Sequence, residues 1–72
     1  MTTVKIHSEY ILLGQMLKFS GIIGNGGEAK SFLSSNFVFI NGNLDQRRGK
    51  KLYPGDIIEV LNTKYLIVSD EK

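Results

Sequence analysis

The sequence contains no cysteine and only one histidine among its 72 residues, and these absences exclude several classes of small protein. Without cysteine the chain has neither a disulfide framework nor thiolate ligands for a metal. His7 would leave a zinc ion to be held mainly by carboxylates, which is a poor ligand set for structural zinc. We therefore expect no structural zinc and no cofactor.

Long apolar segments are also lacking, since the longest uninterrupted apolar runs are four residues, as at 10–13 and 37–40. A membrane-spanning helix needs about 20 apolar residues, and the core of a signal peptide needs about 7 to 15. The apolar fraction of 42% and the charged fraction of 22% are ordinary for a globular protein. We expect one soluble, cytoplasmic domain covering residues 1–72.

Positive charge is concentrated in one short segment. Residues 41–53 carry four cations, Arg47, Arg48, Lys50 and Lys51, against the single carboxylate Asp45, a net charge of 4 − 1 = +3. We expect these cations to have no acidic partners beside them, so that they repel one another unless an anion binds. Phosphate is the commonest biological anion for such a cluster. The alternative is a solvated loop that only keeps the surface polar.

The first half of the chain predicts a strand followed by two helices. Residues 3–7 alternate polar and apolar side chains, as a half-buried strand does. Leu13, Met16 and Leu17 are spaced for one helix face, which predicts a helix over 11–20. Asn25 and Glu28 match a capping box that would begin a second helix over 26–35, with Asn36 as its left-handed end. The short connection predicts a helical hairpin.

The second half predicts strands and turns. Asn41-Gly42 favours a type I′ turn between strands at about 37–41 and 44–46. Pro54-Gly55 fits the centre of a type II turn. Strands at about 57–61 and 64–68 would then pair around Asn62-Thr63. The predicted fold class is α+β, with an N-terminal strand and a helical hairpin packed on a small, curled antiparallel sheet.

Two nucleotide-binding patterns are nearly matched at 24–31, but their context is missing. Residues 24–29 approach the dinucleotide fingerprint, and residues 24–31 approach a P-loop. Both patterns require a preceding parallel strand and a larger sheet, whereas here a helix precedes the glycines. Backbone N–H groups ahead of the second helix would still favour an anion. Because His7, Ser8 and Glu9 are too close in sequence to form a catalytic triad, we expect no enzyme.

Several motifs in order resemble one known family. They are LGQMLK at 13–18, NGGEAK at 25–30, VFING at 38–42 and RRGKKLYPGDIIE at 47–59. Taken together over residues 4–68, they resemble the S-four RNA-binding domain, which is named for ribosomal small-subunit protein four. Among its variants the chain is most similar to free-standing, YaaA-like bacterial proteins. Asn36 stands where many relatives have glycine, and Ser31, Ser34 and Ser35 stand where relatives often have basic residues.

The resemblance implies a set of positions that contact structured RNA. The implied contacts are Gln15, Lys18, Gly26, Gly27, Lys30, Arg47, Arg48, Lys50 and Lys51. Tyr53, which lies beside the basic run, is the aromatic side chain that we add as a base contact, whereas Phe32, Phe37 and Phe39 are expected in the core or on a sheet face.

The expected function is non-enzymatic, ribosome-associated RNA binding. The resemblance points to structured RNA, either ribosomal RNA or a ribosome precursor, as the partner, with no membrane and no small-molecule substrate. The alternative is a protein-interaction module that docks an acidic partner through the same basic surface. The sequence does not separate these two functions.

Overall fold

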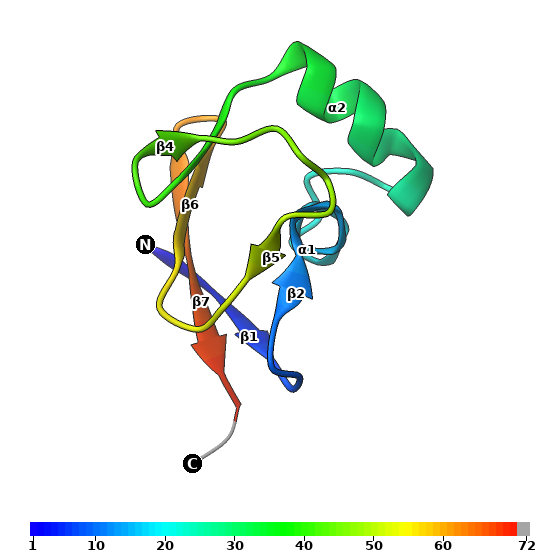
Figure 1. Cartoon of the computed structure of the whole chain (residues 1–72). Helices are drawn as coiled ribbons and strands as arrows, with labels where there is room; N and C mark the ends of the chain where they lie inside the picture. The colour runs from blue at the N-terminus through cyan, green and yellow to red at the C-terminus, as the bar shows by residue number, and fades with distance from the viewer. Residues whose placement is uncertain (71–72) are drawn as a thin grey trace.

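The computed structural model describes residues 1–70, which form two helices packed on a mixed sheet (Figure 1). The large sheet has the strand order β1-β7-β6-β3-β4, and a small ribbon pairs β2 with β5. The elements are β1 (Thr2–Ile6), β2 (Ile11–Leu12), α1 (Leu13–Phe19), the 3-10 turn η1 (Gly26–Glu28), α2 (Ala29–Ser35), β3 (Val38–Ile40), β4 (Asn43–Leu44), β5 (Lys51–Leu52), β6 (Ile57–Val60) and β7 (Thr63–Ser69).

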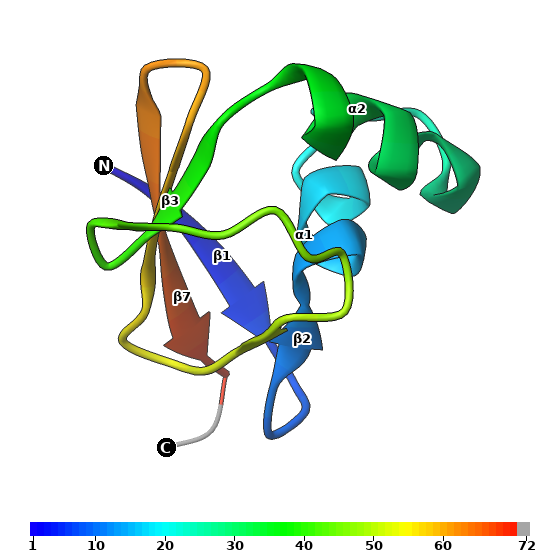
Figure 2. The same ribbon diagram turned by 45° about the horizontal axis from the view of Figure 1, so that its top comes forward.

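The core lies between the helices and one face of the large sheet. Alternate residues of the strands point inward, among them Val4 in β1, Ile58 in β6 and Ile67 in β7. Leu13 and Leu17 of α1 are fully buried against them. Figure 2 shows both helices on the same side of the sheet. No helix within residues 1–70 is long and apolar enough to cross a membrane.

The predicted antiparallel pairing of the four later strands is confirmed, and the N-terminal strand joins their sheet in parallel, so the large sheet is mixed. β1 pairs with β7 in parallel, from Thr2 opposite Tyr65 to Ile6 opposite Ser69, whereas β6–β7, β3–β6 and β3–β4 are antiparallel. Alternation in residues 3–7 correctly predicted a half-buried strand. It carries no information on strand direction, because either direction buries the same face.

The first helix begins at Leu13 and not at residue 11, because residues 11 and 12 form a strand. Ile11 lies opposite Leu52 and Leu12 opposite Lys51 in the β2–β5 ribbon. The N–H of Leu12 donates to Gln15 Oε1 at 3.0 Å, which closes the first turn of the helix. The apolar run at 10–13 suits both a helix and a strand, so the spacing alone placed the boundary wrongly.

The second helix has the expected beginning but a different end. Glu28 Oε1 accepts from the backbone N–H groups of Gly24 at 2.7 Å and Asn25 at 2.9 Å, which confirms its part in the predicted capping box. Asn36 has an extended backbone with φ −136°, so the predicted left-handed end is wrong. Instead, its side-chain Nδ2 donates to the Phe32 carbonyl oxygen at 3.0 Å and so closes the last turn.

The predicted turns are confirmed, one of them with a shift of one residue. Asn41 and Gly42 have φ of 51° and 85°, as a type I′ turn requires, and Gly55 has φ 98°, as a type II turn requires. Between β6 and β7 the residues with positive φ are Leu61 and Asn62, not the predicted Asn62-Thr63.

Asn41 also joins two of these turns through its side chain. Its Nδ2 donates to Asp56 Oδ1 at 3.0 Å, and its Oδ1 accepts from the Ile57 N–H at 2.9 Å. Asp56 Oδ2 in turn accepts from the Tyr53 N–H at 2.8 Å. The β3–β4 hairpin is therefore fixed to the segment that returns from the basic loop to the sheet.

Replacing Asn41 by Ala should lower the free energy of unfolding by about 2 kcal/mol, because it removes two hydrogen bonds and strains a positive φ. Urea unfolding followed by circular dichroism measures the change. Asn43→Ala, at an exposed position of β4 in the same hairpin, is the matched control and should change stability little. Equal free energies of unfolding for the two variants would contradict the conclusion that the Asn41 side chain joins the two turns.

Candidate nucleic-acid interface

The basic loop, defined as residues 46–51, is fixed to the beginning of α1 by backbone hydrogen bonds. The N–H of Leu13 donates to the Lys50 carbonyl oxygen at 2.8 Å, and the N–H of Gly14 donates to the Arg48 carbonyl oxygen at 2.9 Å. The first N–H groups of a helix have no acceptor within the helix, and the loop supplies carbonyl acceptors for two of these N–H groups. The loop backbone thus has a defined position on the helix.

Gly14 lies where α1 meets both the basic loop and α2. A Cβ at position 14 would lie 3.4 Å from both the Arg48 carbonyl oxygen and the Ala29 Cβ, at the short end of ordinary van der Waals contact. A glycine inside a helix usually lowers its stability. A methyl group at position 14 would therefore just fill the space between α1, α2 and the basic loop.

A hollow of about 340 Å³ lies between α1, η1 and the basic loop, and we call it the basic hollow. It brings together four predicted contact residues from three distant parts of the chain. They are Gln15, Lys18, Gly26 and Arg48. Gly14, Ala29 and Gly49 leave this hollow free of bulky side chains. Lys18 and Arg48 give it a positive charge that an anion can neutralise.

Arg48 also borders a second hollow of about 390 Å³, on the side of α2. Lys30, Ser34 and Gln46 line this hollow with it. The Gln46 side chain is held in place because its Nε2 donates to the Leu33 carbonyl oxygen at 2.6 Å and the Asn36 carbonyl oxygen at 3.2 Å. Arg48 therefore joins the two hollows into one cationic surface along the helical hairpin.

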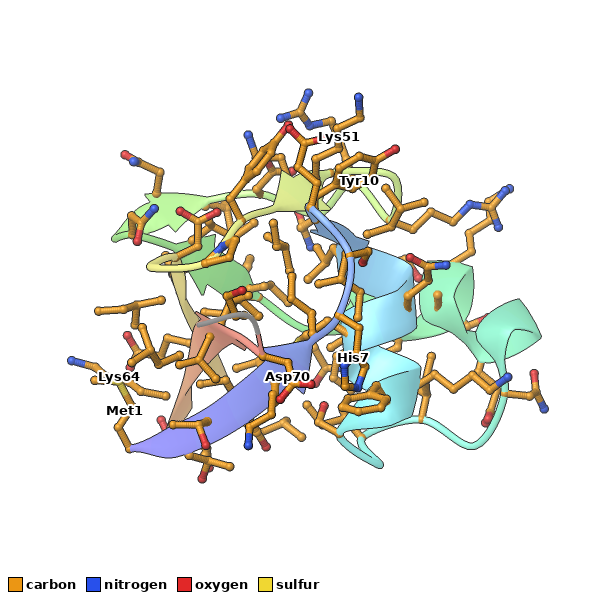
Figure 3. All side chains as sticks on the ribbon, turned by 90° about the horizontal axis from the view of Figure 1, so that it is seen from below. Met1, His7, Tyr10, Lys51, Lys64 and Asp70 are labelled. Atoms are coloured by element: carbon orange, nitrogen blue, oxygen red, sulfur yellow. The ribbon has the colours of Figure 1, made fainter. Side chains whose placement is uncertain are left out.

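Lys51 and Tyr53 lie in a different group, beside Tyr10. The Lys51 Nζ lies 4.8 Å from the centre of the Tyr10 ring, and the rings of Tyr10 and Tyr53 are 5.8 Å apart and tilted by 52°. Figure 3 shows Lys51 and Tyr10 close together. Sequence reasoning missed Tyr10, because its position depends on the unpredicted β2–β5 pairing.

Arg47 has an acidic partner, which corrects the expectation that the basic run lacks one. Its Nη2 donates to Asp45 Oδ2 at 2.7 Å and its Nε to Asp45 Oδ1 at 3.0 Å. These hydrogen bonds from Arg47 lower the pKa of Asp45 to about 2, although partial burial opposes the shift. Asp45 is thus ionised at neutral pH and offsets the charge of Arg47.

The other cations of the surface differ from Arg47 in this respect. Within residues 1–70 the ion pairs join Lys5 to Asp70 and Arg47 to Asp45, and the His7 side chain also contacts Asp70. His7 and Asp70 lie together in Figure 3, with His7 Nδ1 2.8 Å from Asp70 Oδ2. Lys18, Lys30, Arg48 and Lys50 take part in no ion pair in this part of the chain. Their charge is available to a ligand.

The turn before α2 differs from the prediction that its backbone N–H groups would favour an external anion. The carboxylate of Glu28 already accepts the N–H groups of Gly24 and Asn25, so the chain supplies its own anion at this turn. Gly26 lines the basic hollow, and Gly27 is exposed beside it. These glycines keep the turn small next to Lys18 and Arg48. Within residues 1–70 there is no cluster of three or more metal-ligating side chains.

The fold and the cationic surface define the class of this chain: a small α+β module in which unpaired cations converge between a helical pair and a loop. A family model described as the S4 domain matches residues 4–68. The chain belongs to the S4 domain family, as its motifs suggested.

The chain is also similar to a protein of Bacillus subtilis (strain 168) named "Probable ribosome maturation protein RlbA". The two sequences are 49% identical over 57 residues, which cover 79% of this chain and 80% of the relative. The similarity therefore extends over most of both chains.

Replacing Arg47 by Ala should raise the pKa of Asp45 from about 2 toward its ordinary value of 3.8, because the carboxylate loses both hydrogen bonds from the guanidinium and keeps only the one from the backbone N–H of residue 47. Carbon-detected NMR titration of the carboxyl group measures this pKa. The pKa of Asp45 is lower in the folded state than in the unfolded state. The stabilisation of the folded state by ionised Asp45 is therefore complete above about pH 4 and disappears as the pH falls toward 2.

Arg48→Ala is the matched control for this titration, because it removes the same charge from the neighbouring position. It should leave the pKa of Asp45 near 2. A carboxyl group that titrates near pH 2 in both variants would contradict the assignment of the shift to Arg47.

Proposed function

We propose that the protein is a non-enzymatic RNA-binding protein that recognises structured RNA in ribosomal RNA or a ribosome precursor. The observation that carries the proposal is the convergence of Lys18, Lys30 and Arg48 around two adjoining hollows. Membership of the S4 domain family and the ribosome maturation name of the relative support it. The same considerations favour a cytoplasmic protein that works beside the ribosomal particle.

The proposed binding mode is neutralisation of phosphates by cations on a rigid scaffold. Lys18 and Arg48 would contact phosphates at the basic hollow, with Lys30 extending the contact along α2 and Lys50 along the loop. Gln15, Gly26 and Gly27 would approach the RNA backbone beside them. A-form RNA offers 2′-hydroxyl groups and a wide, shallow minor groove to such a surface, so structured RNA is favoured over duplex DNA.

The four predicted loop cations do not contribute equally to this proposal. Arg47 shares its charge with Asp45, so its net contribution to phosphate binding is small. Lys51 lies over the Tyr10 ring and would contact RNA together with Tyr53, which is 43% exposed. Arg48 borders both hollows and is therefore the central contact of the proposed interface.

Salt dependence of RNA affinity tests this binding mode. With about four phosphates neutralised, the logarithm of affinity should fall with the logarithm of salt concentration at a slope of about −3 to −4. Replacing Lys18 or Arg48 by Ala should flatten the slope by about one unit each, while the melting temperature stays nearly unchanged. The RNA is a labelled fragment of ribosomal RNA, identified by crosslinking in cells and sequencing.

Three further variants sharpen this measurement. Lys64→Ala removes an exposed cation of β7, outside both hollows, and should leave the slope unchanged. Asp45→Asn should steepen the slope by releasing Arg47 to bind phosphate. Arg48→Lys separates bidentate recognition from charge alone. Slopes that are identical in all variants would contradict the interface, and partners that remain bound after ribonuclease digestion would favour docking to an acidic protein.

A further inference from the structure

Large apolar side chains gather on the outer part of the sheet, at a distance from the core. Phe37 is 69% exposed, Leu61 is 58% exposed and Phe39 is 37% exposed. Phe39 faces outward because its neighbours in β3, Val38 and Ile40, point into the core. An exposed apolar cluster of this kind marks an interaction site more often than isolated exposed residues do.

These side chains line a hollow of about 290 Å³, which we call the aromatic hollow. Its apolar lining includes Phe37, Phe39 and Leu61. Its polar lining consists of the amides Asn36 and Asn62 and the carboxylate Glu59. The combination of aromatic rings with amide and carboxylate groups suits a planar ligand that carries hydrogen-bonding edges.

The aromatic hollow adjoins the cationic surface through one residue. The carbonyl oxygen of Asn36 accepts a hydrogen bond from Gln46 Nε2 at 3.2 Å. Gln46 lines the second hollow together with Lys30 and Arg48. The second hollow and the aromatic hollow are thus separated by the hydrogen-bonded contact between Gln46 and Asn36.

We propose that the aromatic hollow binds one unpaired base of the RNA whose backbone is held by the cationic surface, an inference that rests on the proposed function. Unpaired bases stack on aromatic side chains and present their edges to polar groups. Phe37 provides the exposed ring for stacking. Because Glu59 is an acid, the hollow repels phosphate and favours a base over the RNA backbone.

Glu59 also selects among the bases. A carboxylate accepts hydrogen bonds from an exocyclic amino group, which guanine, cytosine and adenine have and uracil lacks. Asn36 Oδ1 and the Asn62 amide add acceptors and a donor at the same hollow. The expected ligand is therefore an unpaired, amino-bearing base, bulged from or flanking a structured stem.

A set of RNA hairpins tests this inference. All hairpins share the stem of the crosslinked ribosomal RNA fragment and carry one unpaired guanine, one unpaired uracil or no unpaired base, and fluorescence anisotropy measures their Kd. The wild-type protein should bind the guanine hairpin about tenfold more tightly than the fully paired one, which is the contribution of one stacked base. Phe37→Ala should abolish this difference, and Phe37→Trp should preserve it.

Two further variants serve as matched comparisons. Leu44→Ala removes an apolar side chain that is 52% exposed but lies outside the aromatic hollow, and should behave as wild type. Glu59→Gln should bring the affinities for the guanine and uracil hairpins closer together. Melting temperatures of all variants verify that each one is folded.

The possible outcomes separate this inference from the proposed function. Equal binding of all hairpins by wild type and Phe37→Ala would overturn the base site alone, provided that Arg48→Ala still weakens binding to each hairpin. Wild-type protein that binds no hairpin would overturn both proposals. Concentration-dependent dimerisation that Phe37→Ala abolishes would show that the hollow joins two copies of the chain, and would also overturn the base site.

Discussion

The structure depends on one contact, the docking of two loop carbonyl groups onto the beginning of α1. The N–H groups of Leu13 and Gly14 would otherwise lack partners, and the carbonyl groups of Lys50 and Arg48 supply them. A loop rich in like charges would ordinarily be extended and mobile, because its side chains repel one another. Here the backbone is fixed while the side chains remain in solvent, so the cations project from a defined backbone before any ligand arrives.

The charged groups near the loop fall into two sets: some stabilise the fold, and the others remain available to bind a ligand. Glu28 accepts hydrogen bonds from the N–H groups of the turn before α2, and Asp45 accepts two hydrogen bonds from the side chain of Arg47. Both pairs are local in sequence and order the chain on either side of the basic hollow. Lys18 and Arg48 come from different elements and have no such carboxylate within residues 1–70. Charged groups with local partners thus lie on either side of Lys18 and Arg48, which have no carboxylate partner within residues 1–70.

Local patterns predicted much of this molecule because their causes are local. Asn41-Gly42 adopts the positive φ values of its turn, and Glu28 caps the connection ahead of α2, as their residue types require. Family resemblance and charge also single out Lys18 and Arg48 as predicted contacts, and the structure places both beside the same hollow.

What escaped prediction depends on residues that are distant along the chain. The pairing of Ile11 with Leu52 delays the start of α1 to Leu13 and places Tyr10 beside Lys51, and neither segment signals the other. The pairing of Arg47 with Asp45 is the exception, because it is local in sequence but depends on side-chain geometry that a count of charges does not contain. Phe37, expected in the core or on a sheet face, is 69% exposed because Val38 occupies the inward position. Exposure at a strand end depends on which neighbours the tertiary fold places above it.

The parallel pairing of β1 with β7 has a consequence for how the chain folds during synthesis. Thr2 lies opposite Tyr65, so β1 finds its partner only after all the elements between β1 and β7 have been made. Until then Val4 and Ile6 have no sheet to join, and the core stays open along one edge. Contacts between such distant residues slow folding, because a long loop must close first. The chain therefore completes its sheet only once β7 is present, and a copy that stops short of β7 would be left with an unpaired β1.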